Sequence, residues 1–143
     1  MLTATYNSAF IDYNTPTIIS LGSKISRKYA MKTGSSGTDC YMIGYNPDIL
    51  MLVWNGYDDN RQMNPVDGNI SKNIWVNTVE EYLKDKEARW YDVPENVVGV
   101  PLDAITGNQA VNDKKMYVYY YVKGSEYVNS EMEYEGNKEN ITE

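Results

Sequence analysis

Apolar and polar positions form three short, strand-like runs in the first half of the chain. They cover residues 28–35, 39–45 and 49–54, and each is rich in aliphatic or aromatic side chains. Turn-forming residues separate them at 36–38 (Ser-Gly-Thr) and 46–48 (Asn-Pro-Asp). Connections this short join antiparallel neighbours, because a parallel pair needs a long crossover. The pattern therefore predicts a three-stranded antiparallel sheet.

From residue 69 onward the pattern changes to a helical period. The recurring positions are Ile70, Ile74, Trp75, Thr78, Val79, Tyr82 and Leu83. This spacing predicts an amphipathic helix that lies across the sheet. Asn69 or Ser71 is suited to be its N-cap. Lys84 and Lys86 suit its C-terminal end, where positive charge is favourable.

The flanking parts of the chain are less regular. Residues 97–100 and 116–122 have the composition of two further strands, and 103–107 supply turn residues between them. Residues 2–26 show no clear signal for the start of a helix or strand, which suggests that the sequence begins inside a domain. Within them, residues 18–25 fit either a short helix or a strand. We therefore predict the α+β class, with an antiparallel sheet and a C-terminal amphipathic helix packed on it.

Composition excludes several kinds of chemistry. The single cysteine rules out an internal disulfide framework. The absence of histidine rules out Ser-His-Asp and Cys-His catalysis and the usual histidine-containing zinc sites, so no cofactor or metal is expected. The net charge of −7 argues against nucleic acid or an anionic membrane surface as a partner. The longest apolar run, 49–54, is too short to span a bilayer, and no signal peptide opens the chain.

Two acidic stretches add little to this picture. The loop at 56–60 holds Asp58 and Asp59, and it is either a carboxylate cation site or, as we favour, a polar turn. Residues 125–143 hold six Glu against one Lys. Such a composition buries too little apolar surface to offset the entropy of ordering. We expect a solvated, disordered tail there.

Lys32, Thr33, Gly34 and Ser35 form the one motif that carries chemistry. Alternation along a strand puts the two hydroxyls on one face. Gly34 between them lets the backbone of another molecule approach closely. Two hydroxyls and an ammonium at one strand make a receptor for a carboxylate, and a free strand edge accepts an extended peptide. The alternative is an ordinary solvent-facing edge strand that Lys32 protects from aggregation.

The surroundings of this motif resemble a known family. Lys-Thr-Gly-Ser is followed by an aspartate, an aromatic residue, Gly-Tyr-Asn-Pro at 44–47 and Val-Trp-Asn-Gly-Tyr-Asp at 53–58. Together with the helix and with 97–107 and 123–126, this pattern is similar to the C-terminal part of the transpeptidase domain of class A (bifunctional) penicillin-binding proteins. The resemblance spans most of the chain except the acidic tail. It implies the fold shared by penicillin-binding proteins and serine β-lactamases.

The resemblance also implies roles for the residues of the motif. Thr33 and Ser35 would hold the carboxylate at the D-Ala-D-Ala end of a peptidoglycan stem peptide, or that of a β-lactam. Lys32 would add positive potential, and the Ser35 N–H would be one of two oxyanion-hole donors. Two departures affect the shape of the cleft: Met31 replaces the Gly usual before the motif, and Tyr41 replaces a common Trp.

The nucleophile of that family is absent from this sequence. It is the serine of an S-x-x-K motif, and no serine here has a lysine three positions later. Ser71-Lys72-Asn73 formally fits the family's S-x-N, but it follows the Lys-Thr-Gly motif instead of preceding it. We therefore expect a C-terminal fragment of a D,D-transpeptidase that is inactive alone. It would act with the missing N-terminal part of the same enzyme, on the extracytoplasmic face of the bacterial cytoplasmic membrane.

The expected division of the chain has three parts. Residues 1–90 would form the C-terminal part of the transpeptidase domain, 91–124 a C-terminal strand extension and 125–143 the acidic tail. Two other functions stay open. One is a non-catalytic module that binds peptide or glycan through Tyr and Trp faces and the strand edge at Lys32. The other is a structural remnant whose exposed sheet face lacks its partner half.

Overall fold

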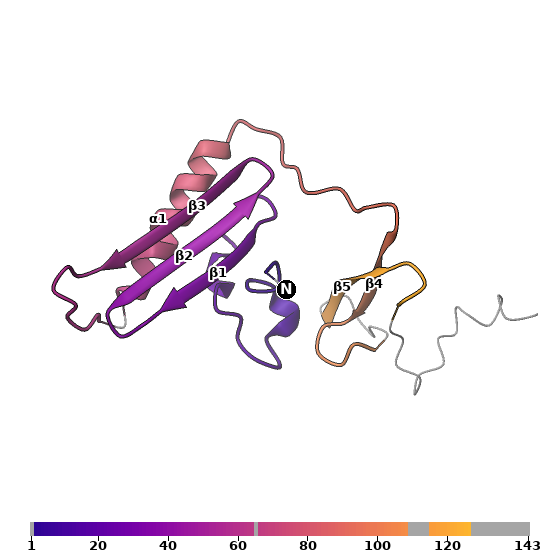
Figure 1. The fold of residues 1–143 in the computed structure, drawn as a ribbon, viewed down its shortest axis with the longest axis horizontal. Coiled ribbons are helices and arrows are strands. Elements are labelled where there is room, and N and C mark those ends of the chain that lie inside the picture. The colour runs from indigo at the N-terminus through magenta and orange to yellow at the C-terminus, as the bar shows by residue number, and fades with distance from the viewer. Residues whose placement is uncertain (1, 65, 109–114, 127–143) are drawn as a thin grey trace, which may run out of the picture. The chain divides into compact units, whose positions relative to one another are not determined.

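The structure is a computed structural model that describes residues 2–64, 66–108 and 115–126. The chain forms two compact units. The first holds residues 2–7 and Thr15–Tyr91, and the second holds Ser8–Asn14 and the described residues from Asp92 onward. Each unit is built on its own antiparallel sheet (Figure 1).

The sheet of the first unit consists of the three strands predicted in the first half of the chain. β1 spans Ala30–Ser35, β2 spans Asp39–Asn46 and β3 spans Ile49–Gly56. They pair antiparallel in the order β1-β2-β3, which confirms the predicted sheet.

Local hydrogen bonds set the ends of these strands. β1 begins later than predicted because the hydroxyl of Tyr6 donates to the carbonyl of Tyr29 (3.1 Å) in place of a strand partner. The turn between β2 and β3 is held by Asn46. Its side-chain oxygen accepts the N–H groups of Asp48 (2.9 Å) and Ile49 (3.1 Å), as asparagine commonly does in turns.

The predicted helix is α1, Gly68–Leu83, and it packs on one face of this sheet (Figure 1). The core between them consists of Ile18, Leu21, Tyr29, Met31, Met42, Val53, Trp75, Val76, Val79 and Leu83. The indole N–H of Trp75 donates to the carbonyl of Met51 (3.0 Å). A Cβ at Gly44 would lie 2.3 Å from the Trp75 ring. The glycine is therefore what allows the helix to approach the sheet this closely.

The predicted N-caps of this helix are wrong. The N-cap is Asp67, and both Asn69 and Ser71 lie inside α1. The carboxylate of Asp67 accepts the N–H of Asn64 (2.9 Å), which fixes the preceding loop, so that the helical backbone already begins at residue 68. Ser71 is buried, and its hydroxyl has no hydrogen-bond partner among the described residues. At the other end Lys84 is the C-cap, which agrees with its predicted place.

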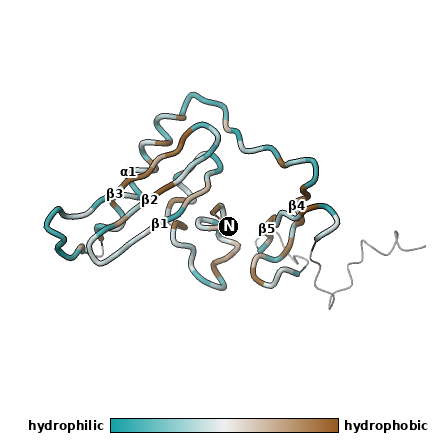
Figure 2. The backbone as a smooth tube through the Cα atoms, in the orientation of Figure 1, coloured by the Kyte–Doolittle hydropathy of each residue, from teal (hydrophilic) through white to brown (hydrophobic). Residues whose placement is uncertain are grey.

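The opposite face of the first sheet carries large apolar side chains that are well exposed. Leu50 is 70% exposed, Leu52 56%, Trp54 45% and Tyr41 40%. Figure 2 shows β3 as mostly brown, because it holds the longest apolar run of the chain. Alternation explains the split: Val53 points to the core, and its neighbours in β3 point away from it.

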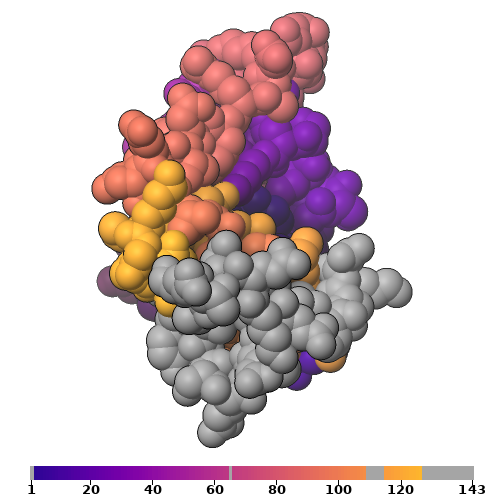
Figure 3. Space-filling view, turned by 90° about the vertical axis from the view of Figure 1, so that its right-hand side faces the viewer, coloured from indigo at the N-terminus to yellow at the C-terminus, as the bar shows by residue number. Residues whose placement is uncertain are grey.

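The second unit is built on β4, Val97–Asp103, and β5, Met116–Val122. These strands were both predicted, and they form a separate two-stranded antiparallel sheet. They pair along their whole length, from Val97 opposite Val122 to Asp103 opposite Met116, and the yellow residues of β5 lie beside orange ones in the space-filling view (Figure 3). The 3-10 helix η1, Ser8–Phe10, belongs to this unit, and the Phe10 ring packs edge-on against Tyr117 with centroids 5.0 Å apart.

The end of β4 forms the predicted turn at 103–107. The carboxylate of Asp103 accepts the N–H groups of Thr106 (2.9 Å) and Ile105 (3.0 Å). These bonds hold the pKa of Asp103 below its usual range. Gly107 has a φ of 72°, a conformation that glycine adopts without strain.

Three other predictions concern less regular parts of the chain. Residues 18–25 contain the 3-10 helix η2, Ile19–Leu21. The loop at 56–60 is a polar turn in which the N–H of Asn60 donates to the carbonyl of Tyr57 (3.0 Å). The predicted disordered tail lies, apart from its first two residues, outside the described residues.

Two searches of the described residues bear on membranes and metals. None of the helices in residues 2–64, 66–108 and 115–126 is both long and apolar enough to cross a bilayer. In the same ranges no three Cys, Asp or Glu side chains come together as metal ligands do.

Candidate functional site

β1 forms one edge of its sheet, and the Lys32-Thr33-Gly34-Ser35 motif occupies its second half. Among the described residues no other strand pairs with the outer side of β1. Lys32, Gly34 and Ser35 are exposed, and Thr33 is half-buried. The motif is therefore accessible to a ligand and is not enclosed between packed layers.

The backbone groups of β1 point alternately to β2 and to the open edge. The N–H of Met31 points to the open side, where it donates to the carbonyl of Leu2 (3.1 Å), and that of Ser36 points to a carbonyl of β2 (2.9 Å). By alternation, Thr33 and Ser35 also present their N–H and C=O groups to the open edge. The Ser35 N–H, the expected oxyanion donor, thus has no partner within the sheet.

The side chains of β1 alternate in the same way. Met31 is buried in the core beneath α1, so Thr33 and Ser35 share that side of the sheet. Lys32 and Gly34 face the other side. The ammonium of Lys32 turns back and donates to the carbonyl of Thr33 (2.8 Å), which places it at the open edge.

A pocket of about 270 Å³ opens beside this end of β1. Its lining residues are Thr17, Thr33, Gly34, Ser35, Cys40, Tyr41, Gly68 and Lys72. Three of the four motif residues therefore meet at one pocket, and Lys32 is not among its lining residues. Its lining residues include several that carry a hydroxyl and one lysine, and none of them is Asp or Glu. Such a donor set suits an anion.

Lys72 is the candidate that the sequence prediction missed. It lies near the start of α1, and only the packing of the helix on the sheet brings it beside the motif strand. One signal was available in the sequence. Lys72 precedes the buried Trp75 and Val76 by three and four positions, so it shares their face of the helix.

Asp39 holds the turn that follows the motif. Its carboxylate accepts hydrogen bonds from the hydroxyl of Thr38 (2.7 Å), the indole of Trp54 (2.9 Å) and the hydroxyl of Ser36 (3.0 Å). These bonds hold the pKa of Asp39 below its usual range. Because Ser36 directly follows Ser35, the network also fixes the end of the motif strand.

Met31, which departs from the family pattern, finds its space inside the core. It stands opposite Gly44 in the strand register. A Cβ at Gly44 would lie 3.0 Å from Cγ of Met31. Because Gly44 of β2 has no side chain, there is room for the side chain of Met31 on β1. Methionine is flexible and adapts readily to such a space.

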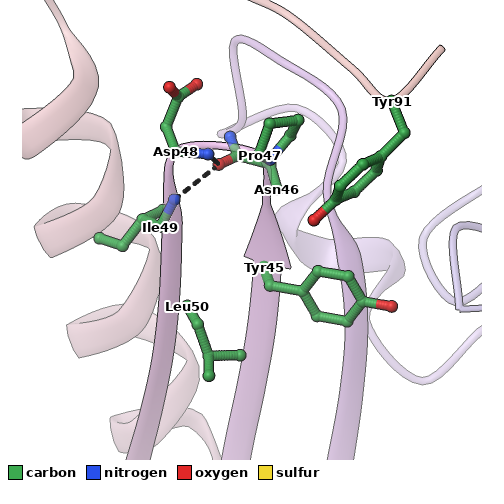
Figure 4. Close-up of a pocket in the computed structure, with 7 residues that line it drawn as sticks. All are labelled: Tyr45, Asn46, Pro47, Asp48, Ile49, Leu50 and Tyr91. Atoms are coloured by element: carbon green, nitrogen blue, oxygen red, sulfur yellow. Dashed lines mark hydrogen bonds between the residues drawn. The ribbon is translucent and has the colours of Figure 1, made fainter.

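A second pocket, of about 500 Å³, surrounds the turn between β2 and β3 (Figure 4). Tyr45 and Tyr91 line it with rings that meet edge-on, their centroids 6.4 Å apart, and Leu50 adds apolar surface. The side-chain oxygen of Asn46 accepts the N–H of Ile49 (3.1 Å), drawn as a dashed line. The Asn46 amide nitrogen is buried and has no hydrogen-bond partner among the described residues.

No family model matches the chain. The known proteins with similar sequences are penicillin-binding proteins, as the residues around the motif indicated. Penicillin-binding protein 2D of Bacillus subtilis is 31% identical over 131 residues, which are 90% of this chain and 19% of that protein. Penicillin-binding protein 1A of Neisseria meningitidis is 34% identical over 73 residues, 48% of this chain and 9% of that protein. The chain thus spans about a fifth or less of the length of these relatives.

A solved structure shares the fold. It is the crystal structure of penicillin-binding protein 1A from Haemophilus influenzae, with a TM-score of 0.65 at 21% sequence identity. The match covers 85% of this chain and 20% of that one.

Proposed function

Because the homologues of this chain are penicillin-binding proteins, mostly of type 1A, we propose that it is the C-terminal part of a D,D-transpeptidase domain that cross-links peptidoglycan. It contributes one wall of the active centre. β1 receives the carboxylate at the D-Ala-D-Ala end of a stem peptide, or that of a β-lactam. The attacking serine belongs to another part of the same enzyme, which is the partner of this chain on the extracytoplasmic side of the membrane.

The open edge of β1 is the observation that supports this proposal best. An extended peptide adds to such an edge as a further strand, through backbone hydrogen bonds. Thr33 and Ser35 present backbone groups to this edge, and their side chains line the adjacent pocket. Gly34 between them carries no side chain that would hold a ligand away.

Each group of this wall has a place in acyl transfer. The hydroxyls of Thr33 and Ser35 donate to the ligand carboxylate, and Lys32 adds positive potential at the edge. The Ser35 N–H donates to the oxyanion that develops when a nucleophile attacks the scissile carbonyl. No serine of this chain stands three positions before a lysine, so the chain alone forms no acyl-enzyme.

The experiment is binding of a fluorescent penicillin to the 143-residue chain. We expect reversible binding in solution and no labelled band on a denaturing gel, because the nucleophile is absent. Thr33→Val should weaken the reversible binding about tenfold, since it removes a hydrogen bond to a charged group. Thr78→Val, which removes an exposed hydroxyl from α1, is the matched control and should bind normally. A stable covalent band, or normal binding by Thr33→Val, would contradict the proposal.

A second candidate function, recognition of a glycan, is favoured by the pocket at the β2–β3 turn. Two tyrosine rings suit a sugar, which offers apolar C–H faces to aromatic side chains. Binding of a peptidoglycan oligosaccharide that Tyr91→Ala abolishes and Thr33→Val leaves intact would support it. If the unmodified chain binds no such oligosaccharide, this function is ruled out.

A further inference from the structure

We propose that Lys72 of α1 is a second cation, beside Lys32, that faces the ligand carboxylate held by Thr33 and Ser35. This inference rests on the proposed function, because it assigns a charged partner within the same site. It makes Lys72 a residue that helps to select a carboxylate over an uncharged end.

The placement of the two lysines carries the argument. Lys72 lines the same pocket as the hydroxyls of Thr33 and Ser35. The Lys32 side chain leaves β1 on the opposite face, and its ammonium already donates to the carbonyl of Thr33 (2.8 Å). A ligand carboxylate seated between Thr33 and Ser35 therefore enters the pocket that Lys72 also lines. The pocket, at about 270 Å³, is small for a drug-sized ligand and suits the end of a dipeptide.

The charges around Lys72 leave it available for an anion. The salt bridges of the described residues do not include Lys72, and no Asp or Glu lines the pocket. The closest acid before it in the sequence, Asp67, already accepts the N–H of Asn64 through its carboxylate (2.9 Å). In a chain with a net charge of −7, this pocket is thus a locally positive site. Hydrogen bonds between an ammonium and a carboxylate are stronger than those between neutral groups.

Cys40 provides a direct readout of this pocket. It is the one cysteine of the chain, it carries a free thiol, and it lines the pocket. A ligand that fills the pocket should slow the reaction of Cys40 with iodoacetamide. This reagent is uncharged, so replacing a lysine does not alter its attraction to the site.

The test compares two ligands by their protection of Cys40: N-acetyl-D-Ala-D-Ala and the same dipeptide with an amidated C-terminus. For the unmodified chain we expect about tenfold tighter binding of the free acid, with an affinity that falls as salt is added. Lys72→Gln should remove most of the preference and of the salt dependence, and Lys72→Arg should restore most of what is lost. Lys32→Gln should reduce the preference less than Lys72→Gln does. Lys84→Gln, at the far end of α1, is the matched control and should leave the preference intact.

The outcomes separate this inference from the proposed function. A preference for the free acid that survives Lys72→Gln overturns the inference and leaves the proposed function standing. If Lys32→Gln loses the preference and Lys72→Gln keeps it, the inference is also overturned and the proposed function stands. If neither ligand protects Cys40 in the unmodified chain, both the inference and the proposed function are overturned.

Discussion

The two faces of the β1–β3 sheet are made by the same strands and differ in almost every other respect. The face toward α1 buries Met31, Met42 and Val53 beneath Trp75. The face away from α1 exposes Leu52 by 56% and its neighbours in β3 similarly. Within the described residues, the chain thus covers one face of its own sheet with a helix and leaves large apolar side chains exposed on the other.

The difference shows where the stability of the unit resides. Burial of apolar surface stabilises a fold by about 25 cal/mol per Å², so the face toward α1 supplies most of the stabilising contacts. An exposed patch of large apolar side chains is typical of a surface that contacts another protein part. This agrees with a chain that matches only 19% of a longer relative. The β1 edge, where the two faces meet, carries the candidate site.

The largest effect on stability is expected when the same substitution, Leu→Ala, is made on the α1 side of the sheet and on its exposed side. Leu83→Ala removes a fully buried side chain of α1 and should lower the free energy of unfolding by about 3 kcal/mol through cavity formation. Leu52→Ala shortens an exposed side chain and should cost less than about 1 kcal/mol. Urea unfolding followed by circular dichroism measures both. Equal losses would mean that the two faces are equally covered in solution.

A pair of glycines should give the next largest difference. Gly44→Ala places a Cβ 2.3 Å from the Trp75 ring, which should cost about 2 kcal/mol of stability by overpacking. Gly34→Ala meets nothing nearer than 3.6 Å, on the side chain of Tyr41. Its stability should stay within about 0.5 kcal/mol of the unmodified chain, while dipeptide binding at the β1 edge weakens. A Gly44→Ala variant as stable as Gly34→Ala would contradict the packing of α1 on this face.

A smaller effect is expected from the hydrogen-bond network of Asp39. Hydrogen bonds from Thr38, Trp54 and Ser36 hold its folded-state pKa below the unfolded value, which is about 3.9. The stability that Asp39 adds is therefore present above the unfolded pKa and is lost as the pH falls through the folded pKa.

Asp39→Asn should test this assignment. The stability difference between the unmodified chain and Asp39→Asn should be constant from neutral pH to about pH 5 and should shrink at lower pH. Urea unfolding at a series of pH values measures the difference. A difference that does not change with pH would show that the carboxylate makes no such bonds in solution.

The sequence predicted secondary structure correctly where a segment has one clear pattern of apolar positions. The strand-like run at 39–45 between two turns and the helical spacing from Ile70 to Leu83 predicted β2 and α1. The N-cap prediction failed at Ser71, since a hydroxyl early in a helix looks like a cap although packing buries it. The separate β4–β5 sheet depends on pairing between distant strands, which no local pattern reveals.

The family resemblance assigned substrate binding to Lys32, Thr33, Gly34 and Ser35, and this assignment stays a prediction. Thr33, Gly34 and Ser35 line one pocket, and the side chain of Lys32 leaves the strand on the other face. Lys72 reaches the pocket through the packing of α1 on the sheet, a contact between residues far apart in the sequence.

The most direct test of the proposed wall is the response of individual backbone amides to a ligand. In a ¹⁵N-labelled chain, N-acetyl-D-Ala-D-Ala should shift the Ser35 amide signal most strongly, because this N–H points to the open edge. The neighbouring Gly34 amide, which points to β2, should shift much less. Shifts confined to Tyr45 and Tyr91, with the Ser35 signal unmoved at saturating ligand, would contradict the account.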